Sequence, residues 1–329
     1  GSRRARHARW AASLTAVALA AGALLPTPGL AAQVVVTCLA VALLGFPHGA
    51  LDPLVAAQRS DAGASGRGGT AAFLAAYLAA AGAVVALWLV SPPAGLALFL
   101  ATSAVHFGLG DVPPASDPRE DRARPLRVLV HGSAPIVLPS ALHPAGVGLV
   151  FGWLLGAPAE SVTSWIGSIG PAFVAAWILA AVAAYGPALL RGRAADPQAR
   201  RGALELGLLA ATFAGLPPLL SFTVYFCAWH SARHLIAVDT ALGRDLRARA
   251  LVVGLAVLAA TALLVLAAYV VDPGAATAAA ADQGPGAAMV SAIRTLFIAL
   301  AALTPPHMVV TAVLERRLAA RESRAPRLA

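Results

Sequence analysis

Stretches of roughly 20 apolar residues recur along this chain, and each is long enough to cross the hydrocarbon core of a bilayer as a helix. Of the 329 residues, 59% are hydrophobic and only 12% are charged, whereas a soluble domain carries about 25% charged residues. This excludes a soluble globular protein and predicts an all-α polytopic transmembrane helical bundle of about ten spans, within a range of roughly 8 to 11. The predicted spans cover residues 11–30, 32–57, 71–90, 93–110, 126–142, 169–190, 202–217, 219–239, 250–271 and 288–312.

The segment 143–170 does not fit this pattern cleanly. It is apolar, but Pro144, Pro158 and several glycines interrupt it. We therefore expect an extra span, a re-entrant segment or an interfacial helix there.

All 24 basic residues are arginines, and they are concentrated near the termini and in a few loops. Arginine in short loops is enriched on the cytoplasmic side of a membrane, and with ten spans every cluster falls on the side of the N-terminus. We expect a multi-pass protein of the cell membrane with both termini in the cytoplasm. Its parts would be an arginine-rich N-terminal tail (1–10), a single transmembrane domain that carries the functional site (11–312) and a basic cytoplasmic C-terminal tail (313–329).

The absence of lysine from the sequence excludes several kinds of chemistry. Without lysine there is no Schiff-base retinal site, no phosphate-loop lysine and no pyridoxal-phosphate attachment. The net charge of +9 is divided among loops, so it indicates membrane orientation and not a nucleic-acid-binding surface. Cys38 and Cys227 lie in apolar runs without metal-type spacing, and we expect small buried thiols.

Six of the eight histidines fall inside predicted spans, where an ionisable side chain is costly and is a functional candidate by default. Four of those spans run from outside to inside in the predicted topology, and their histidines lie in the second half of each. These side chains should therefore meet at one level in the cytoplasmic half of the bilayer. They are His48, His106, His230, His234 and His307.

His230 and His234 are four residues apart, which places both rings on one face of an α-helix. Together with His48 and His106 they would form a set of four imidazoles, which suits a divalent metal such as iron, zinc or copper. The alternative for any single histidine is helix packing or hydrogen bonding, but four at one depth favour a metal.

Other polar residues lie close to these histidines in the sequence. Asp52 and Asp111 follow His48 and His106 toward the ends of their spans, where each would either orient a ligating imidazole or face water. Arg233 would form a buried ion pair with one of these aspartates or extend to the interface. For His307 we consider a fifth ligand, a proton-handling group, or a core histidine bonded to a carbonyl.

Aromatic residues flank the same histidines. Phe107, Tyr225, Phe226 and Trp229 would either line a slot for a long apolar ligand or pack in the core. Of the remaining histidines, His131 is expected to be structural, and His7 and His143 to be solvated.

At these residues the sequence resembles the Brp/Blh family of integral-membrane β-carotene 15,15'-dioxygenases. The resemblance is carried by the motif from Gly45 to Asp52 (GFPHGALD), by His106-Phe-Gly with Asp111, by Tyr225-Phe with the His230-Ser-Ala-Arg-His234 box, and by Thr304-Pro-Pro-His-Met308. It implies that His48, His106, His230 and His234 bind Fe(2+). It also implies cleavage of the central double bond of β-carotene by O2 to two all-trans-retinal molecules, with an opsin as a candidate recipient.

Three other readings compete with this one. A membrane di-iron hydroxylase would need about eight intramembrane histidines, more than this chain has. A metal or proton transporter would use the intramembrane His and Asp set, but the sequence has no clear inverted halves. A protein that handles carotenoid or retinal without catalysis would retain the fold and lack turnover.

Overall fold

The computed structural model describes residues 3–57, 67–112, 122–191, 197–242 and 284–324. Within these ranges every regular element is a helix and no strand is present, as predicted. The predicted span 250–271 lies outside the described residues. The elements of the N-terminal part are α1 (Arg3–Leu24), α2 (Leu30–Ala40), the π-helix η1 (Val41–Gly45), α3 (Pro47–Ala50), α4 (Asp52–Ala57), α5 (Arg67–Val90) and α6 (Pro92–Asp111).

The second part of the chain continues the bundle. The helix breaks after α7. The backbone angles of His143 are not helical, and the chain axis bends by 111° between α7 and α8. The elements are α7 (Arg124–Leu142), α8 (Pro144–Leu155), α9 (Ala159–Leu190), α10 (Pro197–Gly215), α11 (Pro218–Thr223), the π-helix η3 (Val224–Ser231), α12 (Ala232–Leu242) and α16 (Gly284–Arg324).

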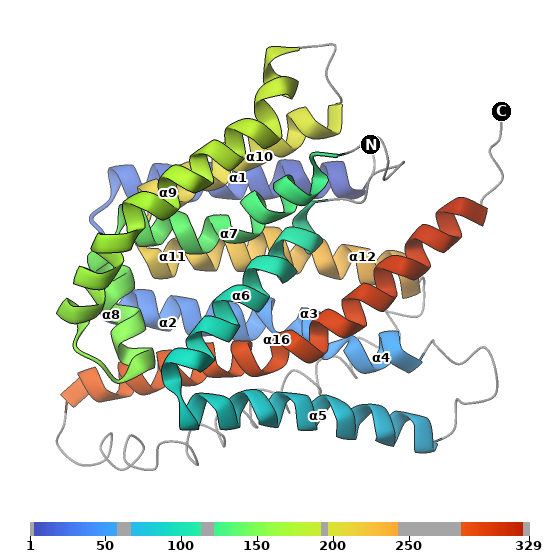
Figure 1. Cartoon of the computed structure of the whole chain (residues 1–329), viewed down its shortest axis with the longest axis horizontal. Coiled ribbons are helices and arrows are strands. Elements are labelled where there is room, and N and C mark those ends of the chain that lie inside the picture. The colour runs from blue at the N-terminus through green and yellow to red at the C-terminus, as the bar shows by residue number, and fades with distance from the viewer. Residues whose placement is uncertain (1–2, 58–66, 113–121, 192–196, 243–283, 325–329) are drawn as a thin grey trace.

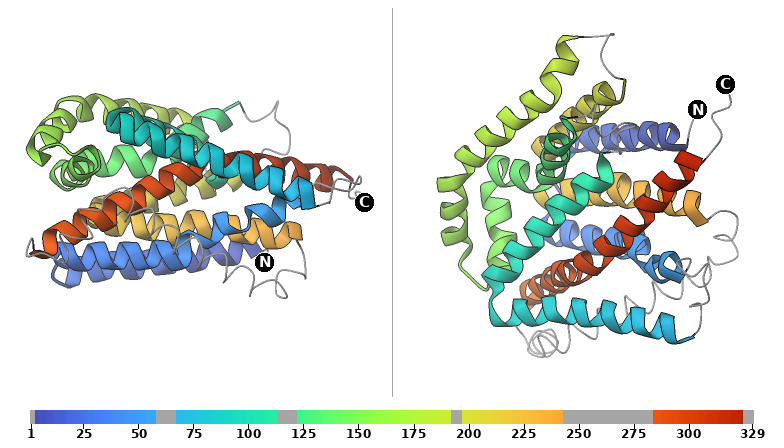
Figure 2. Two further views of the ribbon diagram at one scale, coloured as in Figure 1. Left: turned by 90° about the horizontal axis from the view of Figure 1, so that it is seen from below. Right: turned by 45° about the vertical axis from the view of Figure 1, so that its right-hand side comes forward.

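The helices form two layers with one oblique helix between them (Figures 1 and 2). Seen from below, α1, α2 and α12 lie along one face, and α7, α8 and α9 lie along the other. α16 runs between the two layers and packs against α5, α6 and α2. This arrangement brings residues from both halves of the sequence into the interior of the bundle.

Five helical segments are long and apolar enough to cross a membrane, and the bent pair α7–α8 raises the number to six. These correspond to the predicted spans 32–57, 71–90, 93–110, 126–142, 169–190 and 288–312. The predicted spans 11–30, 202–217 and 219–239 are helical but do not reach this standard of length and apolarity. Their helices include charged residues, such as Arg200, Arg201 and Glu205 on α10 and Arg233 on α12. The segment 143–170 is resolved into α8, a short turn and the start of α9.

The outer surface of the bundle is apolar. Large aliphatic side chains are more than half exposed on several helices, among them Val17 at 65%, Leu78 at 63% and Leu179 at 71%. An apolar patch this extensive is unusual on a soluble monomer and suits contact with lipid tails. The fold is therefore that of a helical membrane protein.

The helix ends that border the arginine clusters lie together. In Figure 1 the starts of α1, α5, α7 and α10 and the ends of α4, α12 and α16 are the right-hand ends of these helices, and α9 ends above them at the top of the view. The short connection between α5 and α6 lies on the opposite, left-hand side. The described arginine-bearing helix ends thus lie toward one side of the molecule.

Two glycines allow α6 and α7 to touch backbone to backbone. A Cβ built on Gly132 would lie 1.7 Å from the carbonyl oxygen of Ala104, and one on Gly108 would lie 2.1 Å from that of Val128. Small residues at such contacts let membrane helices approach closely. This contact fixes the position of α6, which carries His106.

We predict that Gly132→Ala destabilises the protein by about 1–3 kcal/mol, because the added methyl group must push two backbones apart. The matched control is Gly82→Ala on α5, where a Cβ meets nothing within 4 Å. Thermal unfolding in detergent should show a lower Tm for the first variant and an equal or higher Tm for the second. Equal stability of both would show that the α6–α7 contact relaxes freely.

Candidate metal centre

Five histidine rings meet in the interior of the bundle, carried by α3, α6, η3, α12 and α16. Four of the five side chains are buried, and His234 is partly buried. The ring centroids of His106 and His230 are 4.6 Å apart, and that of His48 lies 5.8 Å from His230 and 5.5 Å from His234. The structure therefore brings together all four histidines that the sequence singled out.

Two π-helical segments lead into this cluster. η1 ends at Gly45, three residues before His48, and η3 contains His230 near its end. A π-turn inserts an extra residue into the helical repeat, and such insertions are frequent at functional sites because they redirect side chains. His230 and His234, on either side of the end of η3, both approach His48.

The nitrogen and oxygen atoms of the site form two neighbouring groups of three. One consists of His48, His106 and His230, and the other of Asp52, His234 and His307; within each group the ligand atoms lie within 4.8 Å of one another. Two nitrogens on one metal are separated by at most about 4.2 Å, twice a typical metal–nitrogen distance. The Nε2 atoms of His106 and His230 are 2.9 Å apart, which is within the separation that two ligands of one metal require.

The other ring nitrogens of this cluster face hydrogen-bond acceptors. Nδ1 of His48 donates to the carbonyl oxygen of Gly45, and the hydroxyl oxygen of Ser231 lies 3.1 Å from the same nitrogen. Nδ1 of His230 is 3.5 Å from a carboxylate oxygen of Asp111. An imidazole held by one nitrogen in this way presents the other to a metal in a fixed orientation.

The donor set and one unsatisfied atom fit a metal ion. Buried polar atoms nearly always have a hydrogen-bond partner, yet Nε2 of His307 is buried in this cluster without one. Neutral imidazoles are ligands that iron, zinc and copper accept. The described residues therefore suit a divalent metal of this class.

A buried ionic network supports the site from the side of α10. Arg233 lies 3.4 Å from a carboxylate oxygen of Asp111 and 2.9 Å from one of Glu205, while the Tyr225 hydroxyl donates to Asp111 at 2.8 Å. The sequence suggested Asp111 or Asp52 as the partner of Arg233, and the structure gives Asp111. Glu205 was missed, although it is the one acidic residue in its predicted span.

Asp52 has a different role from the one expected beside His48. It is 1% exposed, and its carboxylate accepts hydrogen bonds from Nδ1 of His307 at 2.8 Å and from the hydroxyl of Tyr77 at 2.9 Å. Its partner is thus His307 and not His48. Tyr77 was also missed by the sequence analysis. Its polar hydroxyl within an apolar span was the available signal.

The aromatic residues predicted to form a slot divide between two roles. Phe107 lines an apolar pocket and its ring lies 4.7 Å from that of His230. Tyr225 and Trp229 use their polar atoms instead, since Tyr225 binds Asp111 and the Trp229 indole donates to Thr15 at 2.9 Å. Phe226 packs between the pocket residue Phe222 and His230, at 5.3 and 6.0 Å between centroids.

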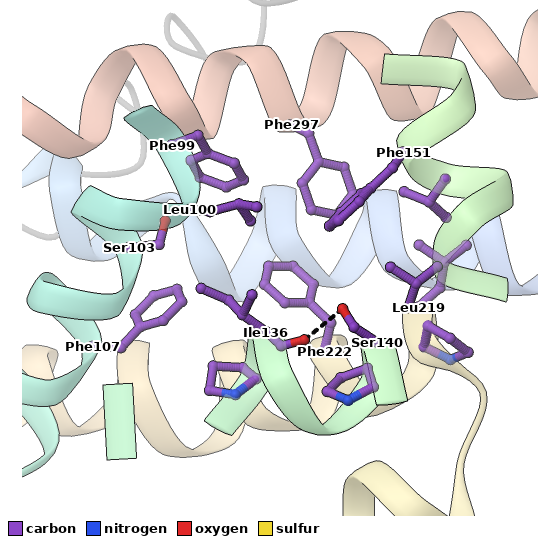
Figure 3. A pocket seen from close by; sticks show the side chains of 15 residues that line it. Phe99, Leu100, Ser103, Phe107, Ile136, Ser140, Phe151, Leu219, Phe222 and Phe297 are labelled. Atoms are coloured by element: carbon purple, nitrogen blue, oxygen red, sulfur yellow. Dashed lines mark hydrogen bonds between the residues drawn. The ribbon is translucent and has the colours of Figure 1, made fainter. Parts of the chain in front are cut away.

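The pocket itself lies between α6, α7, α8, α11 and α16 and is partly open to the outside. Figure 3 shows phenylalanine rings surrounding this space, with the Ser140 hydroxyl bonded back to the Ile136 carbonyl at 2.7 Å. The lining is therefore almost entirely apolar and lies directly beside the histidine cluster. Residues that define it include Phe99, Phe107, Ile136, Phe151, Phe222 and Phe297.

The three remaining histidines lie outside the cluster. His131 is buried and bonded to the Tyr185 hydroxyl at 2.7 Å, which suits the structural role expected for it. The expectation of solvated rings was wrong for His7, which is 8% exposed and bonded to the Ala228 carbonyl, because α1 packs against η3. His143 is half-buried and bonded to the Phe213 carbonyl.

Fold and site together define a helical membrane protein with a buried imidazole cluster beside an apolar pocket. The sequence profile of the family described as beta-carotene 15,15'-dioxygenase matches residues 39–315. The chain belongs to this family of enzymes, as the sequence motifs indicated.

Two curated relatives agree with this assignment. One is named "Probable beta-carotene 15,15'-dioxygenase Blh" from Halobacterium salinarum; it is 32% identical over 303 residues, which cover 83% of this chain and 82% of that protein. The other is a beta-carotene 15,15'-dioxygenase from an uncultured marine bacterium, 28% identical over 272 residues that cover 82% and 90% of the two chains. No solved structure matches the chain.

We predict that Asp111→Asn weakens metal binding about 10- to 100-fold, because the His230 ring loses the carboxylate that orients it. Glu205 keeps Arg233 paired, so the variant should still fold. The control is Glu160→Gln, at an exposed position on α9. Titration of purified protein with Co(2+) measures both affinities, and an unchanged value for Asp111→Asn would separate this carboxylate from the metal site.

Proposed function

We propose that this protein is an iron-dependent dioxygenase that cleaves the central 15,15' double bond of β-carotene with O2 and releases two all-trans-retinal molecules. The observation that carries the proposal is the convergence of buried imidazoles beside an apolar pocket, in a member of this family. In the balanced reaction each half of the substrate takes one oxygen atom and becomes an aldehyde.

Four histidines would hold Fe(2+) in this proposal: His48, His106, His230 and His234. Iron held by neutral imidazoles keeps its positive charge and open coordination positions, and it supplies the electron transfer that lets O2 react with a polyene. The protein contributes the rest. Gly45, Ser231 and Asp111 orient the rings, and the surrounding phenylalanines keep water away from the reacting carbons.

The pocket would bind one half of the carotenoid and so position the central bond. Leu219 lines its far part and lies eleven positions before His230 on the continuous run α11–η3, which is a length of about 16 Å. An extended C40 polyene is about as long as the ~30 Å hydrocarbon core of a bilayer, so half of it matches that distance. Correct positioning of the bond then selects the site of cleavage.

The membrane arrangement proposed with this function has about ten spans and both termini in the cytoplasm. Its support is that the arginine-bearing helix ends lie on one side of the bundle. His48 and His106 are also closer to that side than to the other end of their helices. β-Carotene would enter from the lipid bilayer, and an opsin is a candidate recipient of retinal. The enzyme would be a multi-pass protein of the cell membrane.

We expect β-carotene-producing cells that express the wild-type chain to lose carotene and accumulate retinal in a 1:2 ratio. His230→Ala and His48→Ala should abolish both cleavage and iron retention while leaving the protein in the membrane. Extraction and chromatography of the pigments measure the first effect, and metal analysis of purified protein the second. Unchanged carotene with iron-loaded wild type would favour another polyene, a non-catalytic carotenoid-binding role or transport.

We predict that Ser140→Phe reduces carotene cleavage at least 10-fold and leaves iron content unchanged, because the new ring fills the pocket away from the histidines. Ser168→Phe is the matched control. Ser168 also bonds back to a carbonyl of its own helix, at 2.7 Å, but it is exposed on α9. Turnover by the Ser140 variant equal to that of the control would place the substrate elsewhere.

A further inference from the structure

His307 lies at the centre of the histidine cluster, although it is not one of the four ligands in the proposed function. Its ring centroid is 4.8 Å from that of His48, 5.0 Å from His106 and 4.9 Å from His234. For comparison, the rings of His48 and His234 are 5.5 Å apart. His307 is therefore as close to the proposed ligands as they are to one another.

The two nitrogens of His307 have opposite environments. Nδ1 lies 2.8 Å from both carboxylate oxygens of Asp52, which also accepts the Tyr77 hydroxyl at 2.9 Å. Nε2 is buried and has no hydrogen-bond partner. A carboxylate on one imidazole nitrogen fixes the proton there, so the other nitrogen presents its lone pair.

Nε2 of His307 is a buried nitrogen inside the histidine cluster that the protein itself leaves without a partner. An unsatisfied buried acceptor costs about 1–3 kcal/mol, and no carbonyl or hydroxyl in the described part of the chain meets Nε2 of His307. The expected alternative, a core histidine bonded to a backbone carbonyl, is not what the structure has, since the bonded partner is the Asp52 carboxylate.

The residues directly before His307 also change the local geometry of its helix. Pro305 and Pro306 lie inside α16 directly before His307. A proline inside a helix removes a backbone hydrogen bond and disturbs the turn before it. Inside a membrane such a disturbance is tolerated where neighbouring groups compensate for it. Here it occurs at the helix turn that enters the histidine cluster.

We propose that His307 is a fifth imidazole ligand of the metal, and that Asp52 and Tyr77 hold its ring in the ligating orientation. This inference rests on the proposed metal site and extends it. Five imidazoles leave fewer positions open than four. The carotenoid would then be held by the pocket alone, and only a small molecule such as O2 would have access to the metal.

The test compares His307→Ala and His307→Gln with the wild type, all purified in detergent. We expect one iron per wild-type chain, at least 10-fold weaker metal binding in both variants, and a changed visible absorption spectrum when Co(2+) replaces iron. Added imidazole should restore the wild-type Co(2+) spectrum in His307→Ala by filling the vacated position. His143→Ala, a half-buried histidine outside the cluster, is the control and should keep the wild-type affinity and spectrum.

The outcomes separate this inference from the proposed function. Wild-type affinity and Co(2+) spectrum in both His307 variants would overturn the fifth ligand and leave the four-histidine site intact. Two irons per wild-type chain, one of which is lost in His307→Ala, would overturn it in favour of two ions, one in each group of three. A wild type that binds no metal would overturn both proposals.

Discussion

The structure depends on the cost of burying polar groups where no water can reach them. Five imidazoles, two aspartates and an arginine lie within an otherwise apolar bundle, and each of these groups would be strongly unfavourable alone. The structure pairs them so that most donors meet acceptors, as with Arg233 between Asp111 and Glu205 and His307 on Asp52. One buried atom left without a partner, Nε2 of His307, lies where the imidazoles converge. The remaining helices are arranged around that requirement.

Much of the architecture follows from the sequence because a membrane restricts a chain to few options. Apolar runs of span length had to be helices, and the arginine clusters predicted which helix ends lie together. The same reasoning gave the depth of His48, His106, His230 and His234, and the structure brings them together. The predicted spans at α1, α10 and α12 do not reach the length and apolarity of a membrane span. α10 and α12 carry Glu205 and Arg233, whose charges form a partly buried ion pair inside the protein instead of marking a loop.

The parts that could not be read from the sequence involve register and distant partners. An α-helical repeat predicts one shared face for His230 and His234, and the sequence gives no sign of the π-helical segment η3 that carries the first of them. Tyr77 and Glu205 contact the site from helices whose own patterns look like ordinary spans. Aromatic residues near a histidine do not reveal whether they face a pocket or use their polar atoms elsewhere. Tyr225 and Trp229 bind Asp111 and Thr15, and the pocket is formed mainly by phenylalanines of other helices.

Three helical runs link the pocket to the histidine cluster: α6, α11–η3 and α16. α16 contributes Phe297 to the pocket wall and His307 to the cluster, ten positions later on the same helix. In a regular helix that separation corresponds to about 15 Å along the axis, so α16 sets the distance between these two side chains. A single inserted residue between them would turn one of them away by about 100°. If the pocket holds the carotenoid as proposed, the length of this stretch of α16 determines which part of the bound polyene meets the histidines.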